Sequence, residues 1–239
     1  MRKLSWMLGA AALLLAPMVA SAQAPRRHFD TQGRAYYRGP LRLTAGGGVA
    51  FYTGDLTSSP AQNLPGGNVQ VGIIYPFRPH LSVGGELGWF QIGATDQLAE
   101  RNLAFRSRNS SLTSFLRYEP LHDPARFSVS GANPIGIKPF LQAGAGLLLY
   151  KPILYTGKGR YDGQQAILAP ERSDYPATAV VAPVGGGLSF LLTKGFYLTA
   201  QGTYFFTTTD HLDDVSQRGN PRRNDGYGLA ELKVEYSLK

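Results

Sequence analysis

Residues 209–214 hold the best candidate for chemistry in this sequence, because a histidine lies among three aspartates. An Asp210–His211 pair could activate a water molecule for hydrolysis. The carboxylates of Asp210, Asp213 and Asp214 could instead bind Ca²⁺, which prefers oxygen ligands. A third interpretation is structural: the acids pair with nearby arginines and hold the loops together. We favour ion pairing, because charge clusters are more often structural than catalytic.

No other known catalytic or metal-binding pattern is present. The 239 residues include no cysteine, which excludes disulfides, thiolate metal sites and cysteine nucleophiles. The four histidines show no metal-ligand spacing, and there is no nucleophile elbow, phosphate-binding loop or dinucleotide-binding pattern. The formal net charge of +8 comes from scattered lysines and arginines, so we expect no nucleic-acid partner. We therefore expect a non-enzymatic protein with no catalytic residue, metal site or cofactor.

The N-terminal residues have the pattern of an export signal. Arg2 and Lys3 precede an apolar run over residues 4–19, and Ala20, Ser21 and Ala22 form a small-residue cleavage site. The run is shorter than the about 20 apolar residues that a membrane-spanning helix needs. We predict a cleaved signal peptide over 1–22, a flexible periplasmic lead-in over 23–40 and one domain over 41–239.

From residue 41 onward, hydrophobicity alternates with a period of two, which predicts β-strands. Their length suits strands that cross a bilayer at a tilt, and several end in an aromatic residue. The predicted fold class is an all-β, eight-stranded, antiparallel, up-and-down transmembrane β-barrel. The expected strands cover about 41–52, 69–75, 81–90, 112–118, 141–149, 178–191, 196–207 and 227–238.

The two faces of these strands differ in composition. One carries Leu, Val and Ala, and the other is rich in Gly and bears charges of both signs. A soluble barrel would place its apolar face inside, whereas the glycines and mixed charges suit the small polar lumen of a membrane barrel. We expect a charge network that plugs this lumen, and a location in the cell outer membrane. The expected lumen residues are Arg42, Glu86, Arg117, Glu119, Glu231, Lys233 and Glu235.

Long and short connections are expected to alternate, and the long ones belong at the outer end of such a barrel. Residues 119–136 form a long periplasmic exception. Charged residues in or beside the long loops should share one rim, where they pair with each other or contact a partner. The rim candidates are Asp55, Arg101, Arg106, Asp210, Asp213 and Asp214.

Three segments at this rim, residues 52–56, 101–107 and 209–216, resemble the PorG-like outer-membrane barrels, a family with a member in the type IX secretion apparatus. The resemblance extends from about residue 41 to the C-terminus, and the third segment is its most specific part. Here His211 stands where the family usually has Tyr. The resemblance implies an outer-membrane barrel subunit associated with periplasmic ring and lipoprotein components of a secretion system.

Three functions follow from these observations. The first is an anchor or accessory subunit of a type IX-like secretion complex, surrounded by outer-membrane lipids. The second is a free-standing structural or adhesive barrel of the small OmpA-like type. The third is an outer-membrane hydrolase, for which Asp210 and His211 are the only candidate residues.

Overall fold

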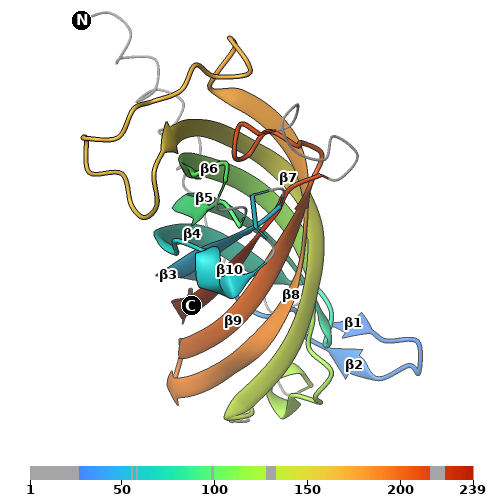
Figure 1. Cartoon of the computed structure of the whole chain (residues 1–239). Helices are drawn as coiled ribbons and strands as arrows, with labels where there is room; N and C mark the ends of the chain where they lie inside the picture. Colours follow the sequence, from blue (N-terminus) through green and yellow to red (C-terminus); the bar gives the residue numbers. More distant parts are fainter. Residues whose placement is uncertain are drawn as a thin grey trace, which may run out of the picture.

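The computed structural model describes residues 27–54, 56–57, 59–97, 100–127, 133–215 and 224–238. Eight strands form a closed antiparallel barrel in which each strand pairs with the next and β10 pairs with β3 (Figure 1). This confirms the predicted fold class. Among the described residues, no helix is long and apolar enough to cross a bilayer. The barrel strands are β3 (Arg42–Thr53), β4 (Gly66–Pro76), β5 (Leu81–Thr95), β6 (Leu103–Tyr118), β7 (Ile137–Thr156), β8 (Ala177–Thr193), β9 (Phe196–Thr207) and β10 (Gly226–Ser237).

Two of these strands are much longer than the sequence predicts. β6 and β7 remain paired up to Leu103 and Thr156, whereas the apolar alternation ends near Leu112 and Leu149. The next outward pair beyond that level, Arg108 with Lys151, is charged. The strands therefore continue past the apolar region, and a pattern based on hydrophobicity cannot detect their ends.

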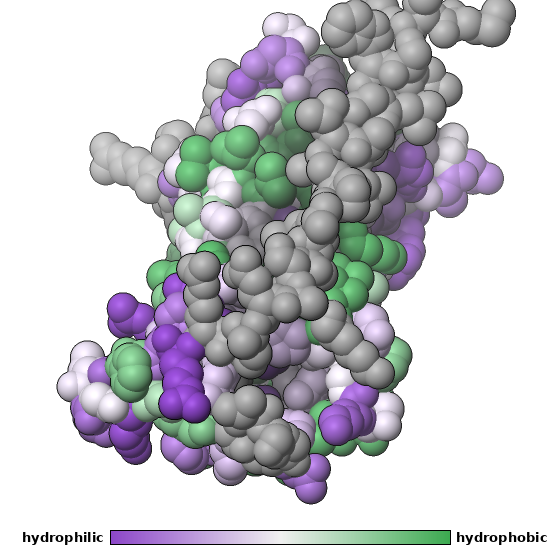
Figure 2. Space-filling model, turned by 180° about the vertical axis from the view of Figure 1, so that it is seen from behind, coloured by the Kyte–Doolittle hydropathy of each residue, from purple (hydrophilic) through white to green (hydrophobic). Residues whose placement is uncertain are grey.

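The outer wall of the barrel is apolar across its middle. Figure 2 shows hydrophobic surface there and hydrophilic residues toward both ends. Aromatic side chains lie near the two limits, with Trp89 and Phe206 toward one end and Tyr118 and Tyr236 toward the other. The predicted assignment of faces is confirmed. The large exposed apolar residues of the wall include Leu43, Val49, Val69, Ile73, Val83, Leu87, Leu112, Leu116, Leu141, Leu147, Val180, Val184, Leu188, Leu232 and Val234.

The interior has two layers of different chemistry. An ionic layer fills the half near the start of β3 and the end of β10, and an aromatic layer fills the other half. Glycines leave room for the ionic layer. A Cβ atom on Gly46 would lie 2.6 Å from Cγ of Lys233, and one on Gly72 would lie 2.5 Å from Cγ of Glu86. Larger residues at these positions would displace the charged side chains.

The two ends of the barrel also differ. In the orientation predicted by the export signal, the end where β3 begins is periplasmic; it has the short β4–β5 and β8–β9 turns, the second with Gly195 at φ +92°. The expected lead-in is not wholly irregular, because β1 (His28–Phe29) pairs with β2 (Ala35–Tyr36) in a small hairpin beside the barrel (Figure 1). The β6–β7 connection contains η2 (Pro124–Arg126), and η1 (Pro60–Gln62) lies in an outer loop. The predicted signal peptide lies outside the described residues.

Candidate functional site

Glu235 is the centre of the ionic layer. Its carboxylate accepts hydrogen bonds from Arg117 Nη1 at 2.8 Å, Arg42 Nη1 at 3.2 Å and Thr199 Oγ1 at 2.9 Å. Arg42 also contacts Glu119 Oε1 at 3.4 Å. The guanidinium of Arg117 lies 3.9 Å from the ring centroid of Phe140, which adds a cation–π contact. One carboxylate therefore joins side chains from β3, β6, β9 and β10.

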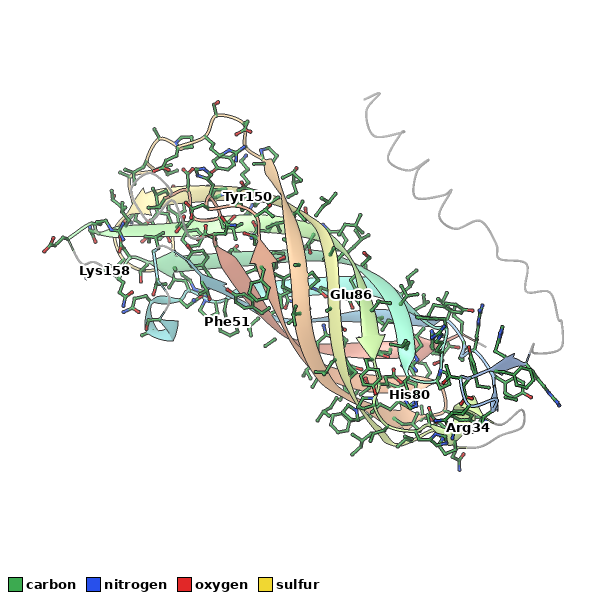
Figure 3. All side chains as sticks on the ribbon, turned by 90° about the vertical axis from the view of Figure 1, so that its right-hand side faces the viewer. Arg34, Phe51, His80, Glu86, Tyr150 and Lys158 are labelled. Carbon is green, nitrogen blue, oxygen red and sulfur yellow. The ribbon has the colours of Figure 1, made fainter. Side chains whose placement is uncertain are left out.

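Lys233 is the centre of a second group of ionic contacts, two residues before Glu235 on β10. Its Nζ atom lies 2.7 Å from Glu86 Oε1, 2.6 Å from Gln70 Oε1 and 3.4 Å from Glu231 Oε2. The other contacts of Glu231 are with Asn68 Nδ2 at 2.6 Å and Gln201 Nε2 at 2.9 Å. Figure 3 shows Glu86 midway along the barrel. These bonds satisfy charges that would otherwise be costly to bury.

The structure brings all seven expected lumen residues together, and it adds two that the sequence analysis did not select, Lys138 and Asp123. Glu119 joins Arg42, and Lys138 pairs with Asp123, which also caps η2. Arg117, Lys233 and Glu235 are almost completely buried. The side chains of the ionic layer therefore fill the lumen in the periplasmic half of the barrel. Lys138 lies at an inward position of β7, so alternation was the signal that could have identified it.

The aromatic layer is closed at the outer mouth by part of the β9–β10 loop. Leu212, Asp213 and Val215, which we call the outer plug, are fully buried. Leu212 and Val215 belong to the same apolar cluster as the strand residues beneath them. Within that cluster, Phe205 stacks on Tyr227 with ring centroids 4.5 Å apart. The described part of the loop up to Val215 is therefore folded into the barrel mouth.

Tyr52 fixes the outer plug through two carboxyl groups. Its hydroxyl lies 2.5 Å from Asp213 Oδ2 and 2.7 Å from Asp225 Oδ1, while Asp225 Oδ2 accepts the Leu212 amide at 2.9 Å. The Tyr52 hydroxyl is the donor in both contacts, so its single proton is shared between two carboxyl groups. Burial, followed by the charge of Asp213, raises the pKa of Asp225 well above its usual range. Burial beside Asp213 therefore favours the neutral form of Asp225.

Asp214 connects the plug to the β7–β8 loop. Its carboxylate accepts hydrogen bonds from the Tyr175 hydroxyl at 2.6 Å and the Glu171 amide at 3.1 Å. Burial raises the pKa of Asp214, and burial with the bond to Asp214 raises the pKa of Tyr175. Asp214 also has φ +63°, a left-handed backbone conformation that is unfavourable for most residues. These contacts hold the loop in that conformation.

The rim candidates do not form a single cluster. Arg101 Nε lies 2.7 Å from Oδ2 of Asp96, an acid that the sequence analysis did not select. Arg106 occupies an outward position of β6 and does not line the barrel mouth, because the alternation of β6 extends to that residue. Asp55 lies outside the described residues. Asp210 is half-buried beside the outer plug. The structure thus places tyrosines and main-chain amides beside Asp213 and Asp214.

The geometry gives little support to the Asp–His pair. Nδ1 of His211 is buried and has no hydrogen-bond partner among the described residues, so no carboxylate orients the imidazole through that atom. General-base catalysis by histidine depends on such orientation. Among the same residues, no group of three or more His, Cys, Asp or Glu is arranged to hold a metal ion.

Comparisons with known proteins give low similarities. No family model and no curated protein matches the chain. Neisserial surface protein A is 14% identical with a TM-score of 0.45, and the match covers 83% of this chain and 97% of that chain. Ail from Yersinia pestis, solved with the heparin analogue sucrose octasulfate, is 14% identical with a TM-score of 0.45 and coverage of 84% and 99%. A major outer membrane protein from Thermus thermophilus has 12% identity, a TM-score of 0.45 and coverage of 83% and 99%.

The membrane class follows from the barrel itself. A closed antiparallel barrel satisfies its backbone hydrogen bonds internally, and its wall is apolar outside and charged inside. The protein is therefore an eight-stranded β-barrel of the outer membrane. Its interior is occupied by side chains at the ionic layer and by the outer plug at the mouth.

Proposed function

We propose that the protein is a non-enzymatic outer-membrane anchor whose periplasmic face binds other subunits of a secretion complex of the type IX kind. The observation that carries this proposal is a folded platform at the periplasmic end, which we define as residues 27–40 and 119–127. Arg34 of the hairpin lies over the ring of Phe127 at 5.6 Å, and Phe127 stacks on His122 at 4.5 Å. The two segments thus form one surface.

The platform is also tied to the barrel. The Glu119 amide donates to the His80 carbonyl at 2.9 Å, and the Gly39 amide donates to the Pro76 carbonyl at 3.2 Å. Phe29 and Leu121 are exposed on these segments, outside the membrane-spanning strands. Exposed apolar side chains in water favour protein contacts. The resemblance to PorG-like barrels supports periplasmic ring and lipoprotein subunits as the partners.

The test is crosslinking of the tagged protein in intact cells, followed by purification from mildly solubilised outer membranes and identification of the captured subunits. We expect ring and lipoprotein subunits with wild type, and a roughly tenfold lower yield with Phe29→Asp if this side chain supplies a central apolar contact. Ile167→Asp is the matched control, because Ile167 is also exposed but lies in an outer loop. Recovery of the wild-type barrel alone would contradict the proposal.

A free-standing structural or adhesive barrel is the second candidate. The β7–β8 connection favours it, because this loop extends from Gly157 to Pro176 at the outer end and exposes Ile167 (Figure 1). Under this function, Phe29→Asp would leave the protein's associations unchanged, whereas Ile167→Asp would weaken attachment of cells to a surface.

A further inference from the structure

Three basic side chains line a pocket on the outer wall of the barrel. They belong neither to the ionic layer nor to the contacts of the outer plug. Arg106 and Arg108 point outward from β6, and Lys151 points outward from β7. With Ile153, Tyr155 and Tyr161 they line a pocket of about 220 Å³, which we call the basic pocket. Lys158, labelled in Figure 3, marks the same end of the barrel.

In the described part of the chain, no salt bridge involves Arg106, Arg108 or Lys151. The lysines and arginines of the lumen, by contrast, are paired with buried acids. Asp162, in the adjoining loop, accepts the Gln164 amide at 2.9 Å. Three like charges close together repel each other, so an anion that binds them would gain more than it would at isolated cations.

The strand register gives the height of the pocket relative to the membrane. Along the outward row of β6 and β7, Leu112 pairs with Leu147, Ser110 with Leu149, and then Arg108 with Lys151. Trp89 pairs with Ser110 on the other side, at the upper aromatic level. From Tyr118 to Arg108 the strand rises roughly 25 Å along the membrane normal, close to the height of the apolar band of such barrels. The cations therefore begin where the hydrocarbon ends.

The wall of the pocket is formed by aromatic residues with defined positions. The Tyr155 hydroxyl donates to the Gly159 carbonyl at 2.8 Å, and the rings of Tyr155 and Tyr161 lie 5.2 Å apart. Arg160 is held separately through its contact with the Pro65 carbonyl at 2.9 Å. The site is thus a recess with a fixed side and three cations, unlike a scattered group of surface lysines.

We propose that the basic pocket binds the phosphate groups of a phosphorylated lipid headgroup in the outer leaflet. Arginine guanidinium groups match phosphate oxygens in a bidentate manner, and lysine adds a point charge. The apolar wall below the pocket would contact the acyl chains of the same molecule. A phosphorylated lipid can contact the basic pocket and the apolar wall at the same time, whereas a soluble anion can contact only the basic pocket.

The test measures binding of bisphosphorylated lipid A to the purified, folded protein by native mass spectrometry. The triple variant Arg106→Gln/Arg108→Gln/Lys151→Gln should bind on the order of 100-fold more weakly, from the usual contribution of each cation near an anionic surface. The matched control, Arg38→Gln/Arg78→Gln/Lys194→Gln, removes three exposed cations from the periplasmic end and should bind like wild type. Equal losses in both variants would overturn the proposal.

Two further arms identify the source of the anion. Wild type should bind lipid A without phosphates only weakly, with an affinity similar to that of the triple variant for intact lipid A. Tight binding of the dephosphorylated lipid would overturn the proposal. A soluble sulfated glycan and inorganic phosphate should bind much more weakly than the lipid. The lipid proposal fails if the glycan or phosphate binds as tightly as lipid A and the triple variant loses only the binding of that soluble anion. The ligand would then be a soluble anion. Arg106→Lys/Arg108→Lys keeps the charge and should lose only part of the affinity.

Discussion

The two layers of the barrel interior are closed by opposite kinds of chemistry. In the ionic layer, Glu235 and Lys233 join strands across the lumen through side chains that cannot leave without exposing a buried charge. In the aromatic layer, a loop fills the mouth with Leu212 and Val215, and Tyr52 holds it through two carboxyl groups. The first device belongs to the strands and the second to a loop. We therefore expect the second to open more readily than the first without unfolding of the barrel.

The largest expected effect is in the ionic layer. Glu235→Leu should lower the free energy of unfolding by about 3–5 kcal/mol, because Arg42 and Arg117 lose their shared carboxylate and remain buried. Urea unfolding in lipid vesicles, followed by the fluorescence of Trp89, measures this. Leu147→Ala, on the exposed outer wall, is the control and should cost less. Equal losses would mean that the buried charges of the ionic layer contribute no more to stability than an apolar residue of the outer wall.

A smaller effect is expected at the plug. Tyr52→Phe should lower the free energy of unfolding by about 1–3 kcal/mol, since it leaves buried carboxyl oxygens without their donor. Limited proteolysis should show faster cleavage in the β9–β10 loop while the barrel strands stay protected. Global unfolding with no selective cleavage of that loop would contradict a separately opening plug.

The plug should also respond to pH. Asp225 has a raised pKa in the folded protein, so its contribution to stability is complete below the unfolded value of about 4 and declines as pH rises toward the folded value. Cleavage of the β9–β10 loop should therefore be faster at pH 9 than at pH 5. Asp225→Asn keeps a neutral side chain and should reduce this dependence, and the remainder is expected from Asp214, whose pKa is also raised by burial. Asp174→Asn is the control, and the pH dependence should persist in it.

The smallest effect is expected at His211. On the non-enzymatic interpretation, His211→Tyr should leave both the unfolding free energy and the secretion function within experimental error of wild type. A hydrolytic activity of the purified wild-type protein that is lost in this variant, with the barrel still folded, would instead support the hydrolase.

The sequence predicts the barrel because its wall obeys a simple period. Leu43 and Val49 alternate with small or polar residues, and the charges of the Gly-rich face point into the lumen as expected. The outer end of β6 was missed because Arg106 and Arg108 replaced the apolar residues that marked the wall below. The alternation itself continues, because Phe105, Ser107 and Asn109 are buried on the inward face while Arg106 and Arg108 face outward.

The plug was not predictable in the same way. Tyr52, Asp213 and Asp225 come from three separate parts of the chain, and nothing in their local sequence shows that one hydroxyl meets two carboxyl groups. The acidic cluster was noticed, but its partners were expected to be arginines. Contacts between loops depend on how each loop folds, which the periodicity of the strands does not determine.

The position of β10 has a consequence for how the barrel assembles. This last strand supplies Glu231, Lys233 and Glu235, and it also forms the seam with β3 that closes the sheet. Before the seam forms, Arg117 on β6 has no counterion and Glu86 on β5 lacks its lysine. Neutralisation of the lumen and closure of the cylinder are therefore one step, and a half-inserted sheet would present unpaired charges to lipid. We therefore expect pairing of the lumen charges and docking of β10 on β3 to be cooperative.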